Sequence, residues 1–159
     1  MQGLLVPADP EKPIERIAGD FRTDLKKLAK LDFVTRINTR QSQDNGFIGL
    51  VEDDGRQLQL RRNYRAQWLL GYGLDGEISA FLVGPALLIS EAWVDDGMDI
   101  VGLKPDADKW IMDPARFGDD FTLFLHSGKA RAQSMHYDGG AIGGFGHADY
   151  LEAREARRR

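Results

Sequence analysis

The chain of 159 residues contains no cysteine, three histidines and no long run of apolar residues. The absence of cysteine excludes disulfide bonds and thiolate metal sites, and it fits a reducing compartment. A membrane-spanning helix needs about 18 or more consecutive apolar residues, so the sequence predicts no span. Residues Met1 to Pro7 lack the basic stretch and long apolar core of a signal peptide. We therefore expect a soluble, cytoplasmic protein.

The chain also has no excess of positive charge, because it contains 21 basic and 25 acidic residues and has a formal net charge of −4. This balance gives no general attraction to nucleic acid or to an anionic membrane, and we expect neither as a partner. Hydrophobic residues make up 42% and charged residues 29% of the chain, as in ordinary globular domains. One domain of this length buries enough surface to be stable without a metal. We predict no metal ion and no cofactor.

Hydrophobic patterning predicts a single α+β domain over residues 1–137, with a mixed, mainly antiparallel sheet and two or three short helices. The expected strands are 3–6, 14–17, 33–38, 47–51, 57–60, 78–83, 86–89, 98–103, 121–126 and 130–137. The last two are predicted to pair as a hairpin. The expected helices lie near 21–31, 64–70 and 105–112, and the polar run 39–46 is predicted to be a loop. Residues 138–159 are predicted to be a glycine-rich flexible connector and a charged C-terminal tail.

The best candidate binding surface lies where a predicted strand is followed by a helix. Its residues are Arg61, Arg62, Asn63, Tyr64, Arg65 and Trp68. Guanidinium groups beside aromatic rings suit phosphates, bases or carboxylates. Asn63 is the predicted N-cap of a helix from Tyr64 to Leu70, and Gly71 is predicted to end it. The alternative is a solvated amphipathic helix with Trp68 in the core and arginine stems covering apolar surface.

The remaining chemical groups form weaker patterns. His126 and His136 would meet across the predicted hairpin near Asp138, which allows a hydrolase, but their spacing matches no compact metal motif. Serines near these histidines lack the surroundings of a nucleophile elbow. The pairs Asp53-Asp54, Asp95-Asp96 and Asp119-Asp120 are typical of solvated turns. None of these patterns supplies a catalytic signature.

Five short motifs occur in a fixed order. They are Leu4-Leu5-Val6-Pro7-Ala8-Asp9, the helix near Leu25, Val51-Glu52-Asp53-Asp54-Gly55, Asn63-Tyr64-Arg65-Ala66 and Leu82-Val83-Gly84-Pro85-Ala86-Leu87-Leu88-Ile89. This order, over residues 3–90, resembles a small domain-of-unknown-function family carried mainly by bacteriophages, notably those of actinobacteria, and by mobile elements. That family has no established reaction, so the resemblance implies only an accessory phage protein acting in the host cytoplasm.

Three functional hypotheses follow. The first is a non-enzymatic phage accessory protein that binds and modulates a host protein, in host takeover or anti-defence, through Arg61 to Trp68 or the C-terminal arm. The second is a protein that binds or sequesters a small nucleotide or other anionic ligand with the same arginines and aromatic residues. The third is a hydrolase built on His126, His136 and Asp138. An enzyme is the less favoured class, and self-association is left open.

Overall fold

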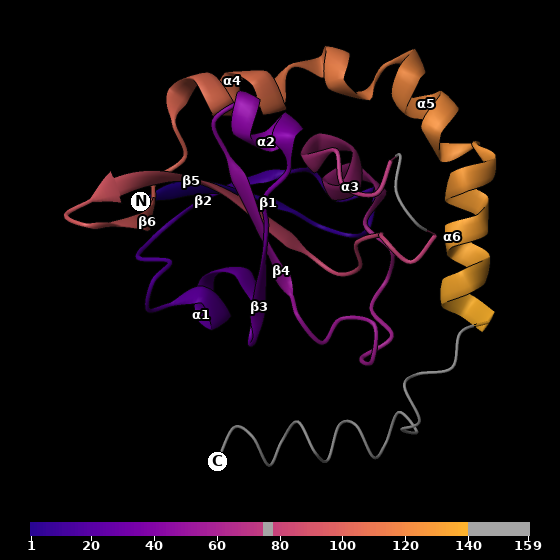
Figure 1. Cartoon of the computed structure of the whole chain (residues 1–159), viewed down its shortest axis with the longest axis horizontal. Helices are drawn as coiled ribbons and strands as arrows, with labels where there is room; N and C mark the ends of the chain where they lie inside the picture. Colours follow the sequence, from indigo (N-terminus) through magenta and orange to yellow (C-terminus); the bar gives the residue numbers. More distant parts are fainter. Residues whose placement is uncertain (75–77, 140–159) are drawn as a thin grey trace.

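The computed structural model describes residues 1–74 and 78–139 of the chain (Figure 1). Its centre is a six-stranded sheet in the order β2-β1-β5-β4-β3, with β6 paired to the outer half of β5. Every strand pair is antiparallel. The strands are β1 (Gln2–Val6), β2 (Glu15–Ala18), β3 (Val34–Ile37), β4 (Ile48–Glu52), β5 (Ala86–Val94) and β6 (Gly97–Val101). The predicted single α+β domain is thereby confirmed.

Helices cover both faces of the sheet and extend beyond it on one side (Figure 1). They are α1 (Leu25–Ala29), α2 (Arg40–Asp44), α3 (Tyr64–Leu70), α4 (Pro105–Met112), the 3-10 helix η1 (Pro114–Phe117), α5 (Asp119–Leu125) and α6 (Gly128–Gly139). The described residues therefore contain more helices than the two or three expected. Within these ranges no helix is both long enough and apolar enough to cross a membrane.

The two faces of β5 bury different halves of the core, because successive side chains of a strand point to opposite sides. Leu88 packs with Leu69 and Leu70 of α3 and with Ile111 of α4. On the opposite face, neighbouring residues of β5 pack with residues around α1. These are Leu87 and Ile89 of β5 with Phe21, Ala29, Leu31, Ile48 and Leu50. The sheet is therefore covered by α3 and α4 on one side and by α1 on the other.

Helix α3 has the bounds that the sequence predicts. The Asn63 side chain accepts a hydrogen bond from the Ala66 N–H at its N-terminus, and Gly71 ends it in the left-handed conformation at φ 68°. The predicted core residues Leu69 and Leu70 have no exposed surface. Local capping and periodicity determine this element, so sequence alone could locate it.

Gly49 fixes how closely α3 approaches β4. A Cβ atom at Gly49 would lie 2.6 Å from Leu70 Cδ1, so even a methyl group requires the buried Leu70 side chain to shift. We expect Gly49→Ala to lower the free energy of unfolding by about 1–3 kcal/mol. The matched control is Gly97→Ala, because nothing lies within 4 Å of its added methyl group. Equal urea midpoints for the two variants would contradict this role of Gly49.

The predicted hairpin of 121–126 and 130–137 is wrong, since these residues form α5 and α6. The aromatic residues of this region repeat at helical spacing, and Phe117, Phe121 and Phe124 contact one another on one side of the helices. In α6 the buried positions are Ala130 and Gln133. A helix that buries a polar side chain lacks the hydrophobic pattern by which helices are recognised.

Three further segments differ from expectation. Residues 57–60 form turns instead of a strand, and in 78–83 only Val83 makes a strand-like bridge, with Arg62. Arg56 supports this irregular region, since its guanidinium donates to the Phe81 carbonyl at 3.0 Å and stacks 4.0 Å from the ring centroid. The expected loop at 39–46 contains α2, which Thr39 and Ser42 cap reciprocally. The predicted connector and tail cover 138–159, of which 138 and 139 belong to α6 and 140–159 lie outside the described residues.

Candidate functional site

The predicted binding segment lies between the sheet and the C-terminal helices, and its first arginine faces solvent. Arg61 is exposed, and its only ion pair within the described residues is with Asp9 at 3.6 Å. A shallow recess of about 380 Å³ adjoins it, lined by Tyr64 and Ser134 among others. The hydroxyl groups of Tyr64 and Ser134 are bonded to each other at 2.7 Å. The recess therefore offers Arg61 as its exposed charge, while its hydroxyls are already partnered.

Arg62 is buried, in contrast, with 7% of its surface exposed. Its Nη1 donates to the Ala130 carbonyl at 2.8 Å and to Ser134 Oγ at 2.7 Å. Its Nη2 donates to Gln67 Oε1 and to Gln133 Oε1, both at 3.0 Å. These bonds join α3 to α6, so the guanidinium holds the fold together and does not face a partner.

Asn63 and Arg65 also bond within the protein. Asn63 Nδ2 donates to the carbonyls of Val6 at 2.9 Å and Gly84 at 2.8 Å. Arg65 Nη2 donates to the carbonyls of Pro7 at 2.9 Å and Asp9 at 3.0 Å. Burial lowers the pKa of Arg65, and the nearby Asp9 carboxylate opposes that shift. Asn63 attaches the start of α3 to the end of β1, and Arg65 attaches α3 to the segment that follows β1.

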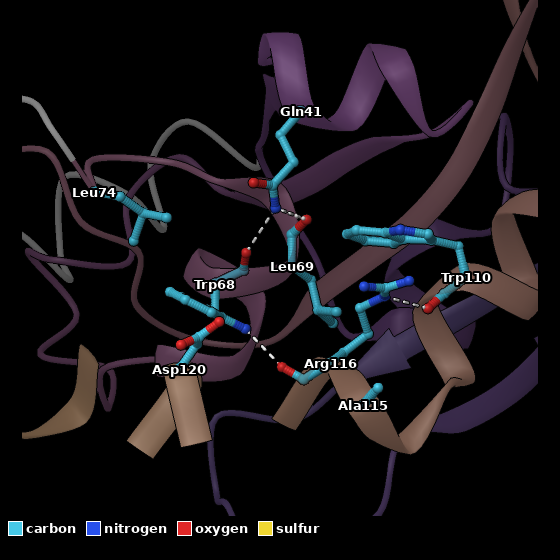
Figure 2. Close-up of a pocket in the computed structure, with 8 residues that line it drawn as sticks. All are labelled: Gln41, Trp68, Leu69, Leu74, Trp110, Ala115, Arg116 and Asp120. Atoms are coloured by element: carbon cyan, nitrogen blue, oxygen red, sulfur yellow. Dashed lines mark hydrogen bonds between the residues drawn. The ribbon is translucent and has the colours of Figure 1, made fainter. Parts of the chain in front are cut away.

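Trp68 belongs to a different place on the molecule, a pocket of about 180 Å³ between α2, α3, α4, η1 and α5. Its lining residues are Gln41, Trp68, Leu69, Leu74, Trp110, Ala115, Arg116 and Asp120 (Figure 2). Trp68 Nε1 donates to the Arg116 carbonyl at 2.7 Å. Its ring stacks on Phe124 with centroids 5.4 Å apart, so one side of the indole is fixed by α5. Trp68 is thus a rigid wall of the pocket.

Arg116 supplies the positive charge of this pocket. Its guanidinium carbon lies 4.1 Å from the centroid of the Trp110 ring, and its Nε donates to the Trp110 carbonyl at 2.9 Å (Figure 2). No other described residue accepts a hydrogen bond from its terminal nitrogens. A guanidinium held by stacking and by one bond at Nε presents two N–H donors in a fixed plane, which is the geometry that binds a carboxylate or phosphate.

Two further polar groups line the pocket. Gln41 uses its Nε2 to donate to the carbonyls of Trp68 at 2.9 Å and Leu69 at 3.0 Å, which leaves its Oε1 as an acceptor. Asp120 lies at the exposed rim and makes no ion pair with the described residues. The pocket therefore combines two tryptophan rings with a cationic group and two acceptors of hydrogen bonds.

His126 and His136, the two histidines among the described residues, do not lie on paired strands. His126 ends α5, and His136 is an exposed residue of α6 next to the Phe81 ring, at 6.3 Å between centroids. The hairpin that would have brought them together does not exist, so the geometric basis of the hydrolase hypothesis is lost. Among residues 1–74 and 78–139, no group of three or more histidine or acidic side chains is placed to hold a metal ion.

No protein-family profile and no curated protein matches the sequence. Among solved structures, the chain is similar to a crystal structure of the small RNA methyltransferase HEN1, with 18% identity and a TM-score of 0.44. The match covers 70% of this chain and 16% of that one, so this chain spans a small part of that protein. A similarity at this level supports no inference about function.

Sequence reasoning identified Trp68 but missed the other residues of the pocket. Gln41 was assigned to a loop and Asp120 to a solvated turn, whereas Trp110 and Arg116 received no role. One signal was present, since Pro114 marks the helix break between Trp110 of α4 and Arg116 of η1. The contact between Trp68 and Arg116 joins residues 48 positions apart and has no local signature.

Proposed function

We propose that this protein is a non-enzymatic binding protein whose pocket between Trp68 and Trp110 takes a small planar ligand carrying an acidic group. The supporting observation is Arg116, whose terminal N–H groups have no acceptor among the described residues while its ring contact and Nε bond hold it in place. An anionic substituent would meet this guanidinium, and a planar ring would lie between aromatic and apolar walls.

The volume of the pocket limits the size of the ligand that it can hold. A cavity of about 150 Å³ accommodates one benzene ring, so the pocket of about 180 Å³ holds a single substituted ring. Larger parts of a ligand would extend into solvent past Asp120. The Asp120 carboxylate and Gln41 Oε1 accept hydrogen bonds and would favour a ring with an amino or imino group. A nucleobase with its phosphate outside, or an aromatic carboxylate, satisfies these conditions.

Tryptophan fluorescence tests this proposal, because two of the three tryptophans line the pocket. With the four nucleoside 5′-monophosphates and benzoate as probes, we expect saturable quenching by at least one compound. Arg116→Met keeps the stem beside Trp110 but removes the charge, and we expect it to weaken binding about tenfold or more. Arg22→Met is the matched control, because Arg22 is an exposed arginine before α1, on the other face of the sheet. Absence of quenching and of thermal stabilisation with every probe would exclude the ligand class.

The protein-partner hypothesis and the bacteriophage origin stay predictions. The inward bonds of Arg62 and Asn63 favour the ligand pocket over a docking face formed by the segment from Arg61 to Trp68. The phage origin rests on the ordered motifs between Leu4 and Ile89. Genes next to the coding sequence would test it, because phage structural or lysis genes are expected there and a conserved bacterial operon would contradict it.

A further inference from the structure

Strand β5 is longer than the sheet around it. Its first residues pair on both sides, since Ala86 to Leu88 pair with β1 and Ala86 to Ile89 pair with β4. Its outer residues, Ser90 to Val94, pair with β6 alone. The β5–β6 hairpin consequently projects from the sheet, at the opposite end of the molecule from α6 (Figure 1). One edge of this projecting segment has no strand beside it in the described residues.

Hydrogen-bond geometry identifies the open edge as the one on the β4 side. Val6 of β1 pairs with Ala86 of β5. If this were a non-hydrogen-bonded pair, the next bond of the ladder would need an N–H from Pro7, which proline lacks. The pair is therefore hydrogen-bonded, and the backbone N–H and C=O of Ala86 point toward β1. The two-residue turn after Val94 requires the same type for the Val94–Gly97 pair. Since backbone groups alternate along a strand, β6 lies on the β1 side. The Leu103 N–H, just after β6, donates to the Gln2 carbonyl of β1 at 2.7 Å, which also places β6 on the β1 side.

The backbone groups of Glu91 and Trp93 therefore point to an edge without a partner strand. The side chains around this edge are unusually apolar for a surface, with Trp93 73%, Val94 46% and Met98 46% exposed. Natural proteins normally protect such edges with proline, a bulge or charged side chains, and from Glu91 to Val94 the single such group is Glu91, whose carboxylate pairs with Arg36. An edge whose one charge is already paired, beside an exposed tryptophan, has the properties of an interface.

A recess of about 370 Å³ lies beside this edge, where β4 begins at Ile48. Glu91 and Met98 line it from the hairpin, and Lys104 lines it from the start of α4. Lys104 is exposed and makes no ion pair with the described residues. The hairpin tip carries the opposite charge, because Asp95 and Asp96 are exposed there and are likewise without ion pairs in the described part of the chain.

We infer that the open edge of β5 pairs with the same edge of a second copy of this chain, in an antiparallel, two-fold symmetric dimer. Pairing centred on Ala92 sets each Trp93 opposite Glu91 of the second copy and uses the free backbone groups of both residues. In this register each acidic tip passes the start of β4 and enters the recess beside Lys104 of the other molecule. The charges of tip and recess are complementary, and this self-complementarity selects a second copy as the occupant.

Sedimentation velocity of the full chain over a wide concentration range tests the dimer. We expect the wild type to dimerise and Lys104→Glu to dissociate about tenfold or more readily, because a glutamate would face Asp95 and Asp96. The double variant Asp95→Lys with Asp96→Lys should be weakened similarly, since lysines would face Lys104. An equimolar mixture of the two variants should form a heterodimer with affinity restored, because both charge contacts are then opposite in sign.

Several outcomes would overturn the inference. If the wild type stays monomeric at every concentration, this edge does not pair with a second copy. If the wild type dimerises and neither charge variant weakens the dimer, the dimer forms through another surface. Two monomeric variants that fail to recover on mixing exclude the complementary contact. Far-ultraviolet circular dichroism melts should match the wild-type monomer in every case, since all three substituted positions are exposed. Trp93→Ala, which removes the largest exposed side chain, should also shift the dimer toward monomer.

Discussion

Replacing Arg62 with alanine is expected to lower the free energy of unfolding by about 3–5 kcal/mol, because it removes the donor at the centre of a buried hydrogen-bond network and leaves several acceptors unpaired. Arg62 is 7% exposed and donates to a carbonyl and two glutamine oxygens that no water can easily reach. Its guanidinium also lies 4.3 Å from the Tyr64 ring centroid and 4.9 Å from that of Phe81. The substitution leaves these acceptors unpaired and opens a cavity between α3 and α6.

Arg61→Ala is the matched control for this prediction. The neighbouring arginine is 63% exposed in its side chain and pairs with Asp9 at 3.6 Å, so its loss should change the free energy of unfolding by about 0.5 kcal/mol or less. Urea unfolding followed by circular dichroism measures both variants, and amide exchange should show that Arg62→Ala loosens α6 first. If Arg62→Ala unfolds at the same urea concentration as Arg61→Ala, Arg62 does not hold α6 to the domain.

The parts of the fold that sequence reasoning located are those with local signals. Helix α3 has an asparagine cap, an apolar face and a terminating glycine within nine positions of the chain, from Asn63 to Gly71. Helix α4 likewise begins at Pro105 and ends before Pro114. In both cases the residues that fix the bounds are neighbours in sequence. The antiparallel sheet was recognised for the same reason, from short alternating segments.

Helix α6 was missed because its buried face is polar. Gln133 is fully buried, and it donates to the carbonyls of Gly73 at 3.1 Å and Ala80 at 3.0 Å. Ser134 beside it accepts from Arg62. Hydrophobic patterning places such residues in solvent, whereas Gln133 is buried by its bonds to Gly73, to Ala80 and to Arg62, which lies 71 positions earlier.

The same contact explains why Arg62 was interpreted as part of a binding surface. Charged residues are rarely buried without partners, and three partners of Arg62, namely Ala130, Gln133 and Ser134, lie far along the chain where the sequence gives no sign of them. The pocket around Arg116 was missed for the complementary reason, because its walls come from five elements, α2, α3, α4, η1 and α5, that lie apart in the sequence. Trp68 was the one pocket residue that a local cluster of aromatic and charged residues could identify.

Asn63→Ala is expected to cost about 2–4 kcal/mol, since it removes a helix cap and leaves two buried carbonyls unpaired. Asn63 is 1% exposed, accepts from the Ala66 N–H at 3.0 Å, and donates to the Val6 and Gly84 carbonyls. It thereby ties α3 to the end of β1 and to the residue before Pro85. Urea unfolding at neutral pH measures the loss, and a change typical of an exposed cap alone, about 1 kcal/mol, would contradict the role of the two donor bonds.

Asn63→Asp distinguishes the contribution of the helix cap from that of the two donor bonds. The introduced carboxyl can still accept from the Ala66 N–H, but it has lost both N–H groups that donate to Val6 and Gly84. At neutral pH its charge faces the carbonyl oxygens of Val6 and Gly84, so we expect a loss at least equal to that of Asn63→Ala. Burial against carbonyls should raise the pKa of the introduced carboxyl above its unfolded value. The native state then binds the proton more tightly, and lowering the pH should recover stability relative to Asn63→Ala. A difference between the two variants that does not change with pH would show that the carboxyl does not face these carbonyls.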